Sequence, residues 1–438
     1  MSDWLHGAPH DVALSFGGDV VRYADLARLV GAARLPEGDG AIGCPAGVDP
    51  VVFVTTVLAA LDRGRPVIVG ASDDEAARLT PLLPARTELG LLTSGSSGAD
   101  GMPRVIARTN ESWLASAEPL AELAGIGSAD RVVATGPLHV SMHLYAVLHA
   151  LRMGATVVDT AERATVAHAT PTRLHRMLDG DATTPGVVVV AGAALAPALR
   201  ERAVERGIRL VEYYGAAELS FVLGGTDGSL RAFPGVEVEL RDRALGPAPH
   251  ARSAPHAGTE LWASSPYLAL DAVGGGELGP GMLRRDARGF ATVGDLAEAD
   301  GRGGVRVLGR ADAAIVTAGA TVLAEDVEAR LTGIPGVEAA AVIGEPHELL
   351  GERVVAVVEL AAGIGVDRVA ALARSVLASS ELPRRWVVRQ LPRTASGKVA
   401  RGVLREEILA ESTHDGATTH EASSTHETPP THEAEAAR

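Results

Sequence analysis

The sequence predicts an α/β protein: a large N-terminal domain of parallel α/β layers plus a barrel-like β piece, followed by a small α+β C-terminal domain. Valine-rich runs alternate with helical patterns between residues 131 and 211, which is typical of parallel strands covered on both faces. Short alternating segments broken by Gly and Pro fill 236–309, which favours antiparallel or barrel-like pairing. Beyond residue 312 a shorter set of helix and strand patterns indicates a separate unit.

The hydrophobic periodicity places most elements of the large domain. A short strand leads into an amphipathic helix within 20–29, a buried helix occupies 51–61, and a buried strand occupies 66–69. The alternation that follows comprises strands at 131–134, 155–158, 187–190 and 208–211 and helices at 141–151, 171–178 and 197–206.

The remaining elements are shorter. Alternating strands are expected at 236–240 and 259–262. The small domain is expected to contain a helix at 323–331, strands at 339–343 and 353–360, a helix at 366–377 and a strand at 386–388.

The last 28 residues, 411–438, differ in composition from the rest. Histidines recur there every six residues, at His414, His420, His426 and His432, in Thr-His-Glu or Thr-His-Asp units with few apolar neighbours. This spacing fits neither one face of a helix nor a known metal-ligand pattern, so we expect a disordered acidic tail.

Charge and cysteine content restrict the partners and the compartment. Forty basic against 55 acidic residues give a net charge of −15, which argues against nucleic acid or an anionic membrane as the main partner. The single cysteine, Cys44, fits a reducing compartment. The N-terminus lacks a signal-peptide pattern, and the longest uncharged apolar stretch, 186–199, has only 14 residues. We therefore expect a cytoplasmic protein without a membrane partner.

A Gly- and Ser-rich stretch follows Leu91 and Leu92, where a buried strand is expected to break into a turn. Glycines permit a backbone nest of N–H groups, the hydroxyls add donors, and Arg104 adds a permanent charge, so the natural guest is a polyphosphate. An ordinary surface loop is the alternative. The stretch is neither a Gly-Lys-Ser/Thr phosphate loop nor a G-x-S-x-G nucleophile elbow. The candidate ligands are Thr93, Ser94, Gly95, Ser96, Ser97, Gly98 and Arg104.

Lys398 is the only lysine in the chain. Because every other Lys/Arg position is arginine, this position indicates a need for a compact ammonium on a flexible stem, which a planar guanidinium does not supply.

Together these stretches resemble, in order, the motifs of the adenylate-forming superfamily, which includes acyl-CoA synthetases, acyl-AMP ligases and nonribosomal-peptide adenylation domains. The Gly-rich stretch resembles T-S-G-S/T-S/T-G-x-P-K/R. Residues 212–218 resemble Y-G-x-T/S-E, and residues 290–295 resemble T-G-D. Residues 309–312 resemble the hinge motif G-R-x-D, which is followed in the superfamily by a glycine, here Gly319, and by E-x-E, here within 325–328. Residues 392–398 resemble P-x-T-x-x-G-K.

The resemblance implies ATP-dependent activation of a small carboxylic acid to an acyl-adenylate. It implies that Lys398 supplies positive charge at the α-phosphate and the attacking oxygen, and that Glu218 holds Mg²⁺ against the phosphates. Asp295 would accept the ribose hydroxyls and Arg310 would brace the nucleotide. Tyr214, followed by Gly215, would stack on or flank the adenine.

The resemblance also implies two domains that move. Asp312 matches the hinge, so we expect an N-terminal AMP-binding domain at 1–311, a mobile domain at 312–410 and the tail at 411–438. Rotation would withdraw Lys398 and bring the segment around Gly319 to the site, where a pantetheine thiol attacks the acyl-adenylate. The thiol donor is coenzyme A or, as a close alternative, the phosphopantetheine of an acyl carrier protein.

His139, in the stretch 137–143, resembles the histidine of a P-L-x-H segment that gates the acyl pocket. His143 is the alternative for that position. Histidines four apart also suggest zinc, but the glutamate of H-E-x-x-H is absent. Small residues at 191–194, with 213–218, would leave room for an acyl or aryl group.

The sequence also departs from the superfamily pattern. Ala217 replaces a hydroxyl residue, Val316 replaces a frequent lysine, and Arg104 stands where lysine is commoner, after three extra residues. These changes leave open a nucleotide-binding protein that has lost turnover, although Glu218, Asp295 and Lys398 are all retained. An amino-acid adenylation domain is disfavoured, because 137–143 holds no aspartate for an α-ammonium group.

Overall fold

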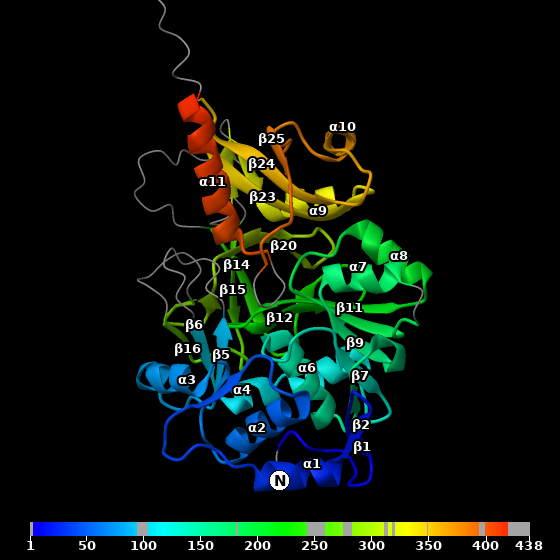
Figure 1. Ribbon diagram of the computed structural model, residues 1–438, viewed down its shortest axis with the longest axis vertical. Coiled ribbons are helices and arrows are strands. Elements are labelled where there is room, and N and C mark those ends of the chain that lie inside the picture. The colour runs from blue at the N-terminus through cyan, green and yellow to red at the C-terminus, as the bar shows by residue number, and fades with distance from the viewer. Residues whose placement is uncertain are drawn as a thin grey trace, which may run out of the picture.

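The computed structural model describes residues 3–93, 104–180, 183–242, 259–274, 283–310, 314–317, 320–347, 349–393 and 399–418. A small domain that contains α9, α10 and α11 lies at one end of the molecule, and α1 lies at the opposite end (Figure 1). Within the described ranges, no helix is both long enough and apolar enough to cross a bilayer.

The largest sheet of the described residues has nine strands in the order β13-β12-β11-β10-β9-β7-β8-β1-β2. The run from β1 through β8, β7, β9 and β10 to β11 is parallel, and β2, β12 and β13 add antiparallel edges. The bounds are β1 Val12–Phe16, β2 Asp19–Arg22, β7 Arg131–Ala134, β8 Thr156–Val158, β9 Val166–Ala169, β10 Val187–Val190, β11 Arg209–Ala216, β12 Ser220–Gly225 and β13 Arg231–Ala232. The expected parallel region is confirmed.

The valine-rich strands are buried on both faces. In β10, Val189 belongs to the main core, whereas Val188 and Val190 belong to a second apolar cluster on the other face. Leu148 of α6 packs into the main core and Leu174 of α7 into the second cluster. Helices therefore cover both faces, which explains why these strands read as continuous apolar runs. These helices are α6 Ser141–Arg152, α7 Pro171–Asp179 and α8 Pro197–Glu205.

A second sheet has the order β16-β6-β5-β4-β3 and carries the Gly-rich stretch between two of its strands. The expected strand before that stretch is β5, and Thr93 at its end pairs in register with Arg104 at the start of β6. The bounds are β3 Ile42–Pro45, β4 Val67–Gly70, β5 Leu89–Thr93, β6 Arg104–Arg108 and β16 Asp271–Gly274. The helices that precede or follow these strands are α1 Tyr23–Ala32, α2 Pro50–Asp62, α3 Asp73–Leu79, α4 Asn110–Leu114 and α5 Ala117–Ala124.

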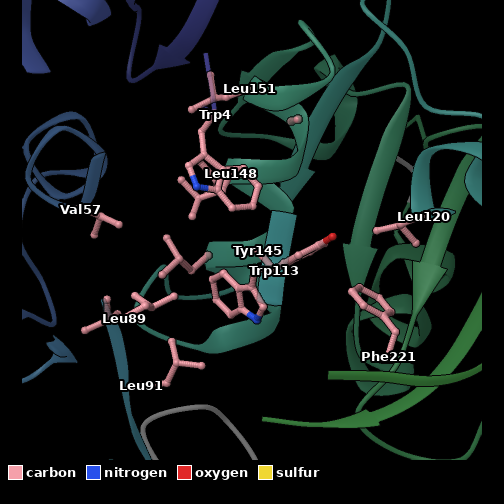
Figure 2. Packing of buried hydrophobic residues seen from close by; sticks show 14 of the residues in the cluster. Trp4, Val57, Leu89, Leu91, Trp113, Leu120, Tyr145, Leu148, Leu151 and Phe221 are labelled. Carbon is pink, nitrogen blue, oxygen red and sulfur yellow. The ribbon is translucent and has the colours of Figure 1, made fainter. Parts of the chain in front are cut away.

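One apolar core joins these two sheets. Tyr145 of α6 lies edge-on to Trp113 of α4 at 5.3 Å between ring centroids and to Phe221 of β12 at 5.0 Å. Figure 2 shows these rings together with Leu89 and Leu91 of β5 and Val57 of α2. Because aromatic rings bury large areas, this cluster fixes the two sheets relative to each other.

The third sheet is antiparallel, as expected for 236–309. Its strands are β14 Glu237–Arg241, β15 Thr259–Ser264, β17 Arg284–Arg285, β18 Ala291–Thr292, β19 Asp295–Ala299 and β20 Val305–Arg310. Leu261 and Ala297 of this sheet join the main core, so all three sheets belong to one body.

The small C-terminal α+β domain has its own apolar clusters, one around Val327 and Leu331 and one around Leu404 and Ile408. Its strands are β21 Ala314–Thr317, β22 Ala320–Leu323, β23 Val337–His347, β24 Gly351–Leu360 and β25 Arg385–Val388, and its helices are α9 Ala324–Thr332, α10 Val366–Val376 and α11 Arg401–Thr418.

Helix α11 continues to Thr418 and so corrects the start of the expected tail at residue 411. The rest of that tail, 419–438, lies outside the described residues.

Candidate active site

A cleft of about 2240 Å³ lies where the carboxyl edge of the nine-stranded sheet meets β5, β6 and β19 and faces α9 and α11 of the small domain. Ligands of α/β proteins bind at this edge of a parallel sheet. The cleft is lined by seven of the residues expected to be functional, namely Thr93, Arg104, His139, Tyr214, Gly215, Glu218 and Asp295.

The other expected site residues lie outside the described part of the chain. They are Ser94, Gly95, Ser96, Ser97, Gly98, Asp312, Gly319 and Lys398. Arg310 ends β20, and its backbone pairs in register with that of Asp295.

The motif at 212–218 forms the end of β11 and the turn to β12. Strand β11 is longer than expected and runs through Tyr214 to Ala216, so that Glu218 lies in the turn rather than in a strand. The pairing shifts register between Tyr214 and Gly215. A Cβ on Gly215 would lie 2.0 Å from the carbonyl oxygen of Ser220, so only glycine allows this close approach.

Arg108 supports this turn from behind, and sequence reasoning missed it. Its guanidinium is fully buried and donates hydrogen bonds to the backbone carbonyls of Ala217 and Tyr267. Burial lowers the pKa of Arg108 to about 9, while the nearby Glu218 carboxylate opposes that shift. Arg108 thus stays cationic at neutral pH and fixes the position of the Glu218 turn.

Tyr214 and Asp295 hydrogen-bond across two sheets. The phenol of Tyr214, on β11, donates to Asp295 Oδ2, on β19, at 2.5 Å. The motif resemblance leads us to expect both residues at the nucleotide but does not indicate this bond. It holds the first residue of β19 against the end of the parallel sheet.

Arg104 is only 7% exposed. Within the described residues no acidic side chain forms an ion pair or hydrogen bond with its guanidinium, and Thr93 Oγ1 donates to its backbone carbonyl at 3.3 Å. A buried cation is costly unless an anion neutralises it. Arg104 therefore fits the phosphate-binding role expected for this end of the Gly-rich stretch.

His139 and His143 line the other side of the cleft. Burial lowers the pKa of both imidazoles, that of His143 to about 4, with a further lowering from Arg173. His143 is 1% exposed, and its ring fills the space that a Cβ on Gly136 would need, at 2.1 Å from Nε2. Both rings are thus neutral at pH 7. Within the described residues no group of three or more His, Cys, Asp or Glu side chains is arranged to hold a metal ion.

The small domain adds an ion-pair cluster to the cleft. Arg401, at the start of α11, pairs with Glu325 at 3.2 Å and with Glu328, both on α9. Glu328 also accepts a hydrogen bond from Val342 N at 2.7 Å. Burial raises the pKa of the Glu328 carboxyl, and Arg401 opposes this shift. Arg401 therefore ties α11, which begins three residues after Lys398, to α9.

The sequence was also compared with known families and proteins. Residues 326–398 match the family described as the AMP-binding enzyme C-terminal domain. Triostin synthetase I of Streptomyces triostinicus is 30% identical over 369 residues, 77% of this chain and 67% of that protein. Feruloyl-CoA synthase of an Amycolatopsis species is 27% identical, with 91% of this chain and 96% of that protein covered.

The fold is also similar to a solved structure, that of ATP-bound MatB from Rhodopseudomonas palustris. The TM-score is 0.73 at 21% identity, and the match covers 93% of this chain and 99% of that one.

Proposed function

This chain belongs to the adenylate-forming superfamily, and from this premise we propose that it is an ATP-dependent acid:CoA ligase. It activates a small carboxylic acid to an acyl-adenylate and then forms a thioester. The observation that carries this proposal is the cleft itself, which is lined by the buried Arg104 and the half-buried Glu218 and Asp295 and also by residues of the small domain.

In the first half-reaction, a carboxylate oxygen of the acid attacks the α-phosphorus of ATP and pyrophosphate leaves. Both reactants are anionic, so the step needs positive charge between them. We assign that role to Lys398, and we assign the holding of the β- and γ-phosphates to Arg104 with Thr93, Ser94, Gly95, Ser96, Ser97 and Gly98.

Other residues that line the cleft are assigned to the rest of the nucleotide and to the metal ion in this proposal. Asp295 binds the ribose, Arg310 braces the nucleotide, and Tyr214 with Gly215 borders the adenine. Glu218 supplies an oxygen ligand for Mg²⁺, which neutralises phosphate charge when bound. His139 borders the acid. The support is that Glu218, Tyr214 and Asp295 line one cleft with Arg104.

In the second half-reaction, a thiolate attacks the acyl carbonyl, a carbon–sulfur bond forms and AMP leaves. We propose rotation about Asp312, between an N-terminal domain at 1–311 and a mobile domain at 312–410, with Gly319 beside the pantetheine arm. The support is that the main core ends before residue 310 and the core of the small domain begins at Ile315.

Two alternatives remain. The acceptor thiol is carried by an acyl carrier protein instead of CoA, an option favoured by the likeness to a synthetase of the triostin type. The other is a nucleotide-binding protein without turnover, motivated by Ala217 and Val316. A cytoplasmic location fits both the reaction and the lone, buried Cys44.

The experiment is acid-dependent pyrophosphate release with and without CoA, using wild type and Lys398→Ala. We expect the variant to lose adenylation by about 10²- to 10³-fold, because one transition-state charge is removed, while it still forms thioester from supplied acyl-AMP. Arg393→Ala, in the same segment but paired with Glu359 at 2.8 Å, is the matched control and should retain adenylation. Equal loss in both half-reactions would contradict the role of Lys398, and release without thioester would favour the carrier protein.

A further inference from the structure

Two arginines of α7 line the cleft without an acidic partner. Arg173 is half-buried and lies in the first turn of the helix, and Arg176 lies one turn further along. Among the described residues no carboxylate forms an ion pair with either guanidinium. By contrast Arg200, another cleft arginine on the neighbouring helix, is neutralised by Glu212. In a chain with a net charge of −15, these two arginines place positive charge without an ion-pair partner at this side of the cleft.

His139 and His143 line the same cleft as Arg173. The charge of Arg173 acts on His143, and His143 in turn interacts with His139. Among the described residues, His143 Nδ1 and His139 Nε2 are buried and have no hydrogen-bond partner. We call Arg173, Arg176, His139 and His143 the α7 cluster. It offers a cation, a second cation and two neutral rings that can each donate or accept a hydrogen bond.

The topology places the α7 cluster away from the nucleotide side. Helix α7 follows β9, which lies between β7 and β10, whereas Tyr214 lies in β11, two strands from β9, and Glu218 follows β11. Neighbouring strands are about 4.8 Å apart, so β9 and β11 are separated by roughly 10 Å along the carboxyl edge. Arg104 lies on a different sheet, at the start of β6.

A half-buried guanidinium and buried, unpartnered ring nitrogens are costly unless a bound molecule satisfies them. We propose, resting on the function proposed above, that the acid substrate carries a second carboxylate, held by Arg173 with Arg176 and the two histidines while the first carboxylate is adenylated. The substrate class is thus a dicarboxylic acid whose two carboxylates are several bonds apart. Arginine suits this role because its planar fork binds a carboxylate through two parallel hydrogen bonds.

The test compares straight-chain α,ω-dicarboxylic acids of four to ten carbons with their monomethyl esters, which keep the length and remove the second charge. Pyrophosphate release gives kcat/KM for each acid. Thermal denaturation with each acid and a non-hydrolysable ATP analogue gives binding without turnover. We expect wild type to prefer one diacid over its monoester by about 10- to 100-fold, as charged hydrogen bonds generally contribute.

The variants assign this preference to a residue. Arg173→Met should remove most of the preference and the diacid-specific thermal shift, and Arg173→Lys should retain part of both. Arg206→Met, which removes one charge from an exposed position just beyond α8, is the matched control and should retain the preference. If Arg173→Met does not fold, the inference is still tested by Arg173→Lys and by the ratio of kcat/KM for the diacid to kcat/KM for its monoester in wild type.

The outcomes separate this inference from the proposed function. Equal or better use of the monoesters by wild type would overturn the inference and leave the ligase intact. A higher KM for CoA in Arg173→Met, with acid preference unchanged, would assign the arginine to the thiol donor and overturn it too. A diacid-specific thermal shift lost in Arg173→Met, without pyrophosphate release from any acid, would support the binding site but contradict the ligase. Absence of any diacid-specific shift or preference overturns the inference.

Discussion

At the scale of single residues, the site depends on positions whose function is to leave space or to hold backbone. Gly215 allows β12 to approach β11 at the register shift, and Arg108 holds the carbonyl of Ala217. The motif identified Gly215, but nothing in the local sequence marks Arg108. Its carbonyl partners lie 109 and 159 residues further along the chain, so only the folded structure brings them together.

Gly215→Ala should destabilise the protein by about 1–3 kcal/mol, because the new methyl group would overlap the Ser220 carbonyl at 2.0 Å and force the hairpin apart. Denaturant unfolding measures this cost. Gly186→Ala is the matched control, since a Cβ there meets nothing within 4 Å. An unchanged midpoint for Gly215→Ala would mean that the turn adjusts freely, contrary to the tight contact described.

At the scale of elements, the small domain depends on the contact between α11 and α9. Arg401 is the only described residue of α11 that pairs with both Glu325 and Glu328, and Glu328 is anchored to β23 through Val342 N. This contact fixes the start of α11, immediately after the segment that carries Lys398.

Arg401→Met should destabilise the small domain by about 1–3 kcal/mol, because it leaves the Glu328 carboxylate buried without its cation, a loss reduced by the partial exposure of Arg401. Burial already raises the pKa of Glu328, so the folded state binds this proton more tightly than the unfolded state does. The loss of unfolding free energy in Arg401→Met should therefore be largest near pH 7–8, where the Glu328 carboxylate is ionised. It should shrink as the pH falls toward the ordinary glutamate pKa of about 4.3, because protonation removes the unpaired charge.

Hydrogen exchange of α9 and β23 across this pH range measures the effect. Arg405→Met, four residues further along α11, is the matched control, since the Arg405 side chain is 50% exposed and lies 3.7 Å from Glu352. It should change stability by less than about 0.5 kcal/mol. If the stability loss in Arg401→Met grew as the pH fell, the predicted direction of the pH dependence would be wrong.

The elements also show what a sequence can predict. Apolar periodicity located β7 and β10 with their bounds unchanged, because buried parallel strands are nearly pure valine. It missed β9, whose four residues include His168, a histidine that is 1% exposed. A polar residue in a short central strand removes the signal that periodicity needs. The length of β11 was also underestimated, because the strand continues into the polar motif.

At the scale of the whole molecule, the apolar cores divide the chain into two bodies. The main core joins all three sheets of the large part and includes Leu148, whereas the core around Leu331 draws only on the small domain. The motif order predicted both units and many residues of the cleft. It could not predict the α7 cluster as a unit, because Arg173 belongs to no motif and its exposure and missing partner are properties of the folded chain.

Two bodies with separate cores should unfold as two cooperative units. Leu331→Ala should lower the stability of the small domain by about 2–5 kcal/mol and leave the large one nearly unchanged, and Leu148→Ala should do the reverse, because each leaves a cavity in one core. Calorimetry together with hydrogen exchange resolves the two transitions. Equal shifts of both transitions by either variant would show one cooperative unit and remove the basis for a freely moving small domain.

The bond between Tyr214 and Asp295 has a consequence for how tightly any guest is held. A hydroxyl that reaches Asp295 Oδ2 has to share this oxygen with a phenol already donating there or replace it, so its net gain is smaller than at a carboxylate without that donor. We expect a molecule with two adjacent hydroxyls, which can donate to both oxygens of the carboxylate, to compete with the phenol better than a molecule with one hydroxyl. Asp295 would therefore favour diols over simple alcohols as its hydrogen-bond partners.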